Sequence, residues 1–329
     1  MPVHAFIFPG QGSQAVGMGR DLAAAFPAAR EVFQEIDETL KQKLSKLMFE
    51  GPGEDLVLTE NTQPALMAHS LAVLRVLAKE GGFALQQKAV VVAGHSLGEY
   101  SALASAGSFS VADAARLLKL RGRSMQQAVP AGEGAMAALL GADMAQAEAI
   151  CAEAAPVPDS DGALEPGHEV VREVVEPAND NGAGQIVISG HRGAIERAVA
   201  LAASKGVRRA MLLPVSAPFH CSLLASAADA MAEARGDTPP RAPVVPLIAN
   251  VTAAKATDPA EIRDLLVRQV TAMVRWRECV NAMVELGVDS FVELGAGKVL
   301  SGLIRRIAPD AATASAATPA EIEALLKNL

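Results

Sequence analysis

Aromatic residues are scarce in this chain of 329 residues, at 3% with one tryptophan and one tyrosine, so the core must be built from aliphatic side chains. Half of the residues are hydrophobic, which is enough for a sizeable core. No apolar run reaches the length of about 18 residues that a membrane-spanning helix needs. The composition therefore predicts a globular protein without a membrane partner.

Cysteine is also rare, and the spacing of Cys151, Cys221 and Cys279 fits neither a disulfide framework nor a metal site. Such usage is typical of the reducing cytosol, and the N-terminus lacks the pattern of a signal peptide, so we expect a cytoplasmic protein. No block of basic residues is present and the net charge is −8, which argues against nucleic acid as a partner.

One segment of the chain, residues 90–102, carries a chemical signal. A β-branched apolar run stops at a Gly-x-Ser-x-Gly turn, and a helix-forming run follows. This layout is typical of a nucleophile elbow, although the bare pattern also occurs as an ordinary loop. Gly94 and Gly98 stand where side chains would crowd the flanking strand and helix. Ser96 is the candidate nucleophile, and the N–H of Leu97 is placed to form half of an oxyanion hole.

Strands alternate with helices along residues 1–129 and again along 214–329, which predicts an α/β core with a parallel sheet covered on both faces. The expected strands are 4–8, 89–93, 244–248 and 289–293. The expected helices are 20–49, 62–80, the segment after Ser96, 111–128, 259–270, 277–286, 298–307 and a last one from Pro319. Between Pro309 and that helix lies a tail rich in alanine and threonine.

Residues 130–213 have a different pattern, in the order strand, helix, strand, strand, helix, strand. The strands are predicted over 135–140, 169–177, 185–189 and 207–213, and the helices over 143–155 and 192–205. This order is the ferredoxin-like one, so we expect a small βαββαβ subdomain inserted into the core. Residues 156–168, rich in proline, aspartate and glycine, predict a surface loop within it.

A serine nucleophile needs a base, because a hydroxyl is weakly nucleophilic at neutral pH. The chain offers six histidines: His4, His69, His95, His168, His191 and His220. His220 follows a predicted strand and a turn between two prolines, which is a usual place for catalytic groups. By elimination it is the best candidate, because the others lie in apolar elements or subdomain loops, or directly beside Ser96.

Three further segments have both an ordinary and a functional interpretation. The loop 8–14 has glycines around Gln11, whose N–H would supply a second oxyanion donor if the loop faces the elbow; otherwise it is a plain Pro-Gly turn. Arg121, with Arg123, either lies on a solvated helix face or grips a carboxylate in two places. Residues 266–269, ending at Gln269, read as a helix end whose free carbonyls could orient an imidazole.

Taken together, these motifs resemble a known family: the malonyl-CoA:acyl-carrier-protein transacylases of bacterial fatty acid synthesis and the acyltransferase domains of polyketide synthases. The matching segments run in family order over almost the whole chain. They are FPGQGSQ at 8–14, GHSLGEYSAL at 94–103, RGRSMQQAVPAGEGAMAALLG at 121–141, GQIVISG at 184–190, PVSAPFHC at 214–221, VRQV with the following RW at 267–276, and ELGAGKVLSGL at 293–303.

The resemblance implies an α/β-hydrolase-like core with a ferredoxin-like subdomain, and an enzyme that moves malonyl from malonyl-CoA to the phosphopantetheine thiol of acyl carrier protein. It implies that Ser96 is the nucleophile, His220 the base and Arg121 the ligand of the malonyl carboxylate. The N–H groups of Gln11 and Leu97 would form the oxyanion hole, and the carbonyl of Gln269 would orient His220. No cofactor or metal is implied, and we expect a monomer.

The same resemblance leaves some questions open. Asn179 and Asn181 fall where the family carries asparagines near the site, and Phe219 is typical of the malonyl-selective acyltransferases. Residues 156–176 are longer and more acidic than in a typical bacterial enzyme, which suggests a tolerated insertion or a docking or gating segment. The alternatives are a polyketide or polyunsaturated lipid acyltransferase, a serine thioesterase or lipase, and a non-catalytic scaffold that binds carrier proteins.

Overall fold

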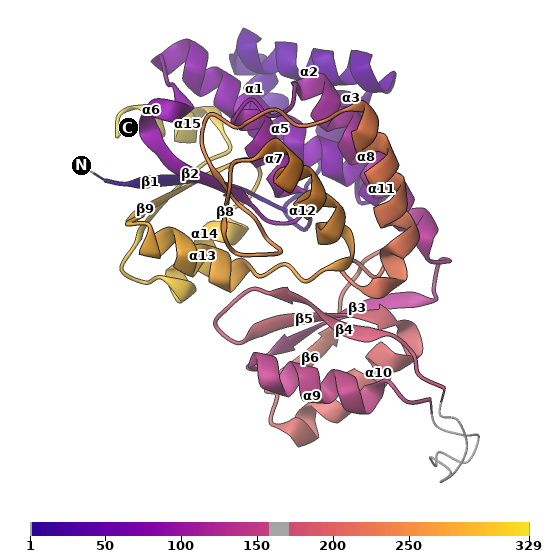
Figure 1. Ribbon diagram of the computed structural model, residues 1–329. Helices are drawn as coiled ribbons and strands as arrows, with labels where there is room; N and C mark the ends of the chain where they lie inside the picture. The colour runs from indigo at the N-terminus through magenta and orange to yellow at the C-terminus, as the bar shows by residue number, and fades with distance from the viewer. Residues whose placement is uncertain (1, 158–170, 329) are drawn as a thin grey trace.

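The chain was analysed as a computed structural model, which describes residues 2–157 and 171–328. Two separate sheets organise the described residues (Figure 1). A six-stranded sheet forms the larger part, and a four-stranded sheet forms the smaller part below it. This arrangement confirms the predicted α/β fold.

The large sheet has the strand order β10-β9-β1-β2-β7-β8. All of its neighbouring pairs are parallel except β7 with β8. Its strands are β1 (His4–Phe8), β2 (Ala89–Gly94), β7 (Leu247–Ile248), β8 (Lys255–Ala256), β9 (Ser290–Leu294) and β10 (Ala312–Ala316). The predicted parallel sheet is therefore present. Because β2 lies between β1 and β7, the loops that follow these strands meet at one edge of the sheet.

Helices cover both faces of the large sheet, as the alternation of side chains in β1 requires. Phe6 and Phe8 pack into the main hydrophobic cluster beneath α2, α5 and α8, whereas Ala5 and Ile7 pack with residues of α13 and α14 on the other face. The helices of this part are α1 (Arg20–Ala25), α2 (Pro27–Leu40), α3 (Leu44–Glu50), α4 (Gly53–Leu56), α5 (Thr59–Gly81), α6 (Leu85–Lys88), α7 (Gly98–Ser105), α8 (Val111–Ala128), α11 (Ala225–Asp237), α12 (Pro259–Thr271), α13 (Trp276–Glu285), α14 (Val299–Ile307) and α15 (Pro319–Leu326). Within the described residues, no helix combines the length and the apolar character needed to cross a bilayer.

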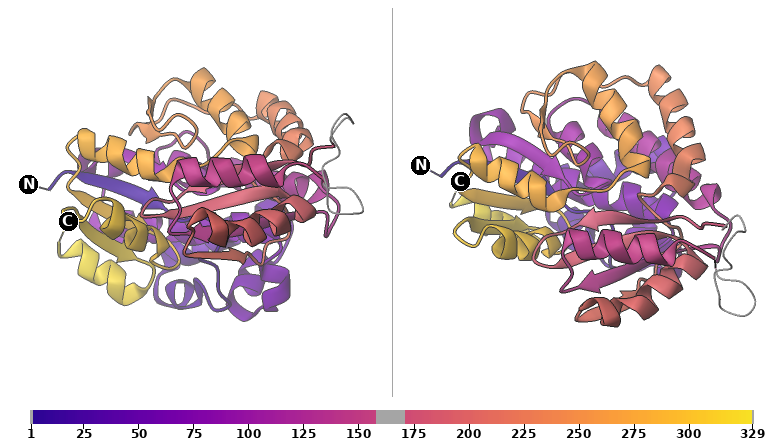
Figure 2. Two further views of the ribbon diagram at one scale, coloured as in Figure 1. Left: turned by 90° about the horizontal axis from the view of Figure 1, so that it is seen from below. Right: turned by 60° about the horizontal axis from the view of Figure 1, so that its bottom comes forward.

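The small sheet has the order β4-β5-β3-β6, and all of its neighbouring strands are antiparallel. Its elements are β3 (Gly134–Leu140), α9 (Met144–Ala154), β4 (Val175–Asp180), β5 (Gln185–His191), α10 (Arg192–Ala202) and β6 (Arg209–Leu212). This is the βαββαβ order that the sequence predicted. Both helices lie on the outer face of the sheet, and seen from below they lie in front of it (Figure 2).

The small sheet joins the core through β4. Val274, in the loop before α13, donates its N–H to Ala178 and accepts one from Asp180, so it acts as a short parallel bridge beside Asn179. An ion pair of 2.8 Å between Arg277 and Asp180 lies next to this bridge. The β4 edge of the small sheet is thereby fixed to the start of α13 and the loop before it.

The single helix predicted over 20–49 is wrong, because the chain forms α1, α2 and α3 there. Pro27 begins α2, and the residue before a proline is disfavoured in helical geometry, which ends α1. Lys41 has a φ of 49°, in the left-handed region, and this ends α2. Apolar periodicity continued across both breaks, so it did not reveal them.

Two strand predictions also differ from the structure, and one strand was not predicted. The strand predicted over 169–177 begins only at Val175, because residues 171–173 contact 155–157 instead of the sheet, and the first part of the predicted strand lies outside the described residues. The strand predicted over 244–248 is reduced to Leu247–Ile248. The alanine- and threonine-rich tail contains β10, which pairs along β9 and was not predicted.

Candidate active site

The candidate nucleophile lies in a sharp turn between β2 and α7. Ser96 has a φ of 54°, a left-handed conformation that a non-glycine residue rarely adopts. A Cβ on Gly94 would overlap the backbone of Gly98, and a Cβ on Gly98 would overlap the carbonyl of Phe8. The two glycines therefore permit the close strand–helix crossing that holds the serine hydroxyl above the sheet, which is the geometry of a nucleophile elbow.

The loop after β1 faces this elbow. The N–H of His95 donates to the carbonyl of Phe8, with N and O 3.1 Å apart. A Cβ on Gly10 would stand 2.7 Å from the carbonyl oxygen of His95, so only glycine allows this approach. Within the described part of the chain, neither the Gln11 N–H nor the Leu97 N–H donates a hydrogen bond. Both donors are thus available to a ligand.

The candidate base contacts the nucleophile directly. Nε2 of His220 lies 2.7 Å from Ser96 Oγ, and Nδ1 lies 2.9 Å from the backbone carbonyl oxygen of Gln269. A carbonyl can only accept, so the proton of the neutral ring is on Nδ1 and Nε2 accepts from the serine hydroxyl. Burial, followed by the nearby positive charge of Arg121, lowers the pKa of His220 to about 3. The ring is therefore neutral at physiological pH, and the lone pair of Nε2 faces the serine hydroxyl.

The candidate carboxylate ligand lies beside this pair. Arg121 comes from α8 and is 1% exposed, whereas Arg123 on the same helix is largely exposed and pairs with Glu60. One guanidinium nitrogen of Arg121, Nη2, lies 3.2 Å from Ser96 Oγ and 2.8 Å from Oε1 of Gln269. The other, Nη1, donates to Oε1 of Gln63 over 2.8 Å. The structure thus distinguishes the two arginines and places a buried cation at the nucleophile.

Two residues that the sequence analysis missed brace the elbow from below. Asn250, fully buried after β7, accepts the N–H of Ser96 with its Oδ1 over 2.8 Å and donates from Nδ2 to the carbonyl of Gly94 over 2.8 Å. Glu99, 1% exposed on α7, accepts the backbone N–H of Asn250 and an N–H of the Gln269 side chain. Glu99 stands three residues after the nucleophile. It is the one charged residue in the segment 90–105, and this was the signal in the sequence that could have identified it.

The side chains of the remaining histidine and asparagine candidates in the described residues have hydrogen-bond or strand partners other than Ser96. His95 Nε2 lies 2.9 Å from Oδ1 of Asn181, so the residue before the nucleophile contacts the small sheet's β4–β5 turn. Asn179 is buried in β4 and forms the bridge to Val274. His191 accepts the N–H of Val174. His4 is only half-buried at the start of β1, and Nε2 of His69 lies 3.0 Å from the carbonyl oxygen of Ala317. His168 lies outside the described residues.

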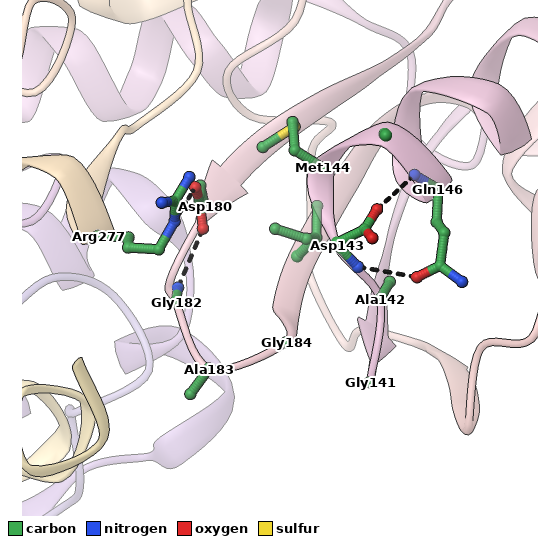
Figure 3. Close-up of a pocket in the computed structure, with 12 residues that line it drawn as sticks. Gly141, Ala142, Asp143, Met144, Gln146, Asp180, Gly182, Ala183, Gly184 and Arg277 are labelled. Carbon is green, nitrogen blue, oxygen red and sulfur yellow. Dashed lines mark hydrogen bonds and ion pairs between the residues drawn. The ribbon is translucent and has the colours of Figure 1, made fainter.

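A separate cavity of about 610 Å³ lies where the β3–α9 connection and the β4–β5 turn of the small sheet face Arg277 of α13 (Figure 3). Its polar groups bind one another: Asp180 pairs with Arg277, and Asp143 and Gln146 form a reciprocal cap at the start of α9. It contains none of the candidate catalytic residues. In the described residues, no group of three or more potential metal-ligating side chains converges. The chemistry thus points to the serine, histidine and arginine cluster, which can form and break an ester next to a bound anion.

Comparison with known proteins agrees with this geometry. The family model described as acyl transferase domain matches residues 5–321. The chain is 46% identical, over 316 residues and 96% of both chains, to the malonyl CoA-acyl carrier protein transacylase of Escherichia coli strain K12. It is similar to the acyl-carrier-protein S-malonyltransferase structure from Bartonella henselae, with a TM-score of 0.91 and 51% identity over 99% of both chains. A malonyl-transacylase solved with its type II polyketide acyl carrier protein has a TM-score of 0.90 and 39% identity, over 99% of this chain and 100% of that chain.

Proposed function

Because the chain belongs to the acyl transferase domain family, we propose that it transfers a malonyl group from malonyl-CoA to the phosphopantetheine thiol of acyl carrier protein. This is the activity of an acyl-carrier-protein S-malonyltransferase, which supplies chain elongation in fatty acid synthesis. The single observation that carries the proposal is the buried guanidinium of Arg121, 3.2 Å from the oxygen of Ser96. A cation at that place suits an acyl group with a free carboxylate.

In the first half-reaction, Nε2 of His220 takes the proton of Ser96 as Oγ attacks the thioester carbonyl of malonyl-CoA. The N–H groups of Gln11 and Leu97 hold the oxyanion of the tetrahedral intermediate, and each such donor is worth about 3 kcal/mol. The C–S bond then breaks, His220 returns its proton to the CoA sulfur, and malonyl remains as a serine ester.

In the second half-reaction, the carrier thiol gives its proton to His220 and its sulfur attacks the ester carbonyl. The C–O bond to Ser96 breaks, and the serine oxygen recovers the proton. The carbonyl of Gln269 keeps the ring of His220 in one tautomer through both halves, a role that needs only an acceptor. No redox step occurs, so the residues named supply all the chemistry and no cofactor or metal takes part.

Arg121 selects the acyl group in this proposal. The planar guanidinium binds a carboxylate in two places, and the bond gains strength because the site is buried. Acetyl-CoA lacks the carboxylate and leaves the cation without that partner. The preference for malonyl over acetyl therefore depends on Arg121.

The proposal includes a division of the chain into two parts. We place the catalytic core at residues 1–129 and 214–329 and the ferredoxin-like subdomain at 130–213, because a separate hydrophobic cluster lies between the small sheet and its two helices. The protein would act as a monomer in the cytoplasm, where malonyl-CoA and carrier protein are both available.

An assay with purified protein, malonyl-CoA and holo acyl carrier protein tests the proposal. Malonyl carrier protein should form faster than free malonate, and apo carrier protein, which lacks the thiol, should accept nothing. Faster release of malonate than of malonyl carrier protein would identify a hydrolase instead. Absence of any CoA release would indicate a non-catalytic scaffold that binds carrier proteins.

A second assay tests the carboxylate ligand. Arg121→Ala should reduce the ratio of malonyl to acetyl transfer by about tenfold or more, since a charge-assisted pair is lost. An unchanged ratio would show that another group binds the carboxylate.

A further inference from the structure

The side chain of Gln269 contacts the candidate arginine and the elbow, apart from its backbone carbonyl, which contacts His220. Its Oε1 accepts from Nη2 of Arg121 over 2.8 Å, and its Nε2 donates to the backbone carbonyl of Ser96 over 3.0 Å. The residue is fully buried near the end of α12. The amide of Gln269 therefore joins the guanidinium to the backbone of the nucleophile, whereas Gln63 binds the other guanidinium nitrogen.

The orientation of that amide is not arbitrary. The buried carboxylate of Glu99 accepts from Nε2 of Gln269, so the amide nitrogen must face α7 and the amide oxygen must face α8. If the amide turned over, its NH₂ group would face the guanidinium and its oxygen would face a carboxylate, and both contacts would be lost. Glu99 thereby determines that Gln269 presents an acceptor to Arg121.

We infer that the Gln269 side chain, oriented by Glu99, is a positioning group that aims Arg121 at the acyl carboxylate and so sets the preference for malonyl. The inference rests on the proposed function, because it needs Arg121 to be the carboxylate ligand. Neither Gln269 nor Glu99 touches the acyl group in this account. Both act through Arg121, whose guanidinium they hold beside Ser96 Oγ.

A role limited to folding would have a different signature. Loss of general support for the elbow would slow the transfer of every acyl group, because Ser96 and His220 serve all of them equally. Loss of the arginine's orientation would slow malonyl transfer much more than acetyl transfer. The ratio of kcat/KM for malonyl-CoA to that for acetyl-CoA therefore separates the two roles.

The experiment compares Gln269→Met with Gln126→Met in the full-length protein. Methionine keeps the volume of the buried side chain while removing the amide, and it leaves the backbone carbonyl that faces His220. Gln126 lies on the same helix as Arg121 and bonds through its amide to the carbonyl of Ser216, so its substitution removes a side-chain hydrogen bond that involves neither Arg121 nor the elbow. Thermal unfolding of each variant verifies that it is folded.

A second variant, Glu99→Gln, tests the orienting carboxylate without removing bulk. Both oxygens of Glu99 accept hydrogen bonds, from Gln269 and from the N–H of Asn250, and an amide offers only one oxygen. The double variant Glu99→Gln with Gln269→Met should lower the ratio no further than the single Gln269→Met, as expected when one residue acts through the other.

We expect the malonyl-to-acetyl ratio to fall by about tenfold in Gln269→Met and Glu99→Gln, in line with the loss of a hydrogen bond to a charged group, and to stay within about twofold in Gln126→Met. Two results for Gln269→Met would overturn the inference, provided that Arg121→Ala still lowers the malonyl-to-acetyl ratio. One is an equal loss of malonyl and acetyl transfer, and the other is an unchanged ratio. An unchanged ratio in Arg121→Ala itself would instead contradict the proposal that Arg121 binds the malonyl carboxylate, and this inference would fail with it.

Discussion

The backbone carbonyl of Gln269 lies 2.9 Å from Nδ1 of His220, although the two residues are 49 positions apart in the chain. In the usual catalytic triad a carboxylate occupies this place and stabilises the charged ring that forms during reaction. A carbonyl also fixes the tautomer but carries no full charge. Together with the nearby guanidinium of Arg121, this favours a ring that is neutral before it takes the serine proton and neutral again after it returns that proton.

Removing the base should nearly abolish both half-reactions. We expect His220→Ala to slow the release of CoA from malonyl-CoA by about 10³-fold or more, because the hydroxyl of Ser96 then has no proton acceptor. Single-turnover measurement of CoA release provides the rate, and circular dichroism verifies the fold. A loss of less than about tenfold would mean that another group takes the serine proton.

The pH profile should reflect the lowered pKa of His220. Burial and the positive charge of Arg121 lower that pKa to about 3, so the ring remains neutral far below the ordinary histidine value of 6.5. Acylation of Ser96 should therefore change by less than about twofold between pH 8 and 5.5. A histidine with an ordinary pKa would lose about tenfold over this range, because only the neutral ring accepts a proton. A measured midpoint near 6.5 would contradict the buried, neutral base.

Stability should fall as the solution is acidified, for a related reason. Burial lowers the pKa of His69, on α5, to about 4, so the unfolded chain binds a proton below pH 6.5 that the folded chain does not. Stability supplied by this difference is complete above about pH 6.5 and decreases as pH falls toward 4, by about 2 kcal/mol at pH 5.

His69→Gln provides the control for this linkage. Its amide can still donate to the carbonyl of Ala317, which lies 3.0 Å from the histidine Nε2, but it does not titrate. Urea unfolding of this variant at pH 7.5 and pH 5 should show a smaller loss of stability than the unmodified protein shows. Identical losses would mean that His69 is not buried as a neutral ring.

The elbow makes a prediction about glycine that has a matched control. Gly94→Ala would place a Cβ into the backbone of Gly98, so the strand and helix must separate; we expect destabilisation of several kcal/mol and loss of acylation. Gly302→Ala, in α14, meets nothing within 4 Å and should stabilise by about 0.5–1 kcal/mol. Denaturant unfolding measures both. A stable, active Gly94→Ala protein would show that the elbow is less tight than described.

The sequence predicted the fold well where apolar periodicity and turn residues agreed. Helix α8 has the predicted bounds 111–128, and the order of the small subdomain was also predicted, because each of its strands alternates with turn or helix signals. The breaks at Pro27 and Lys41 were missed because the apolar pattern continues through them. Strand β10 was missed because it is mostly alanine, which has a weak strand preference, and its pairing with β9 is a tertiary effect.

The candidate site was predictable to the extent that it depends on motifs. Ser96 and Leu97 follow from the elbow, and His220 follows from elimination, whereas the contact of Arg121 with Ser96 joins residues that only the fold brings together. Asn250 and the side chain of Gln269 could not be found from local pattern, since their partners lie 156 and 148 positions away. The role of such a buried polar side chain can be seen only when its hydrogen-bond partners in the fold are known.

The claim that Ser96 carries the malonyl group between two thiols is tested most directly by intact mass spectrometry. The unmodified protein, mixed with malonyl-CoA and quenched in acid, should gain the mass of one malonyl group, and holo acyl carrier protein should remove that mass and acquire it. Ser96→Ala should gain nothing under the same conditions. A malonyl adduct that persists in Ser96→Ala, or one that the carrier thiol cannot remove, would contradict the account.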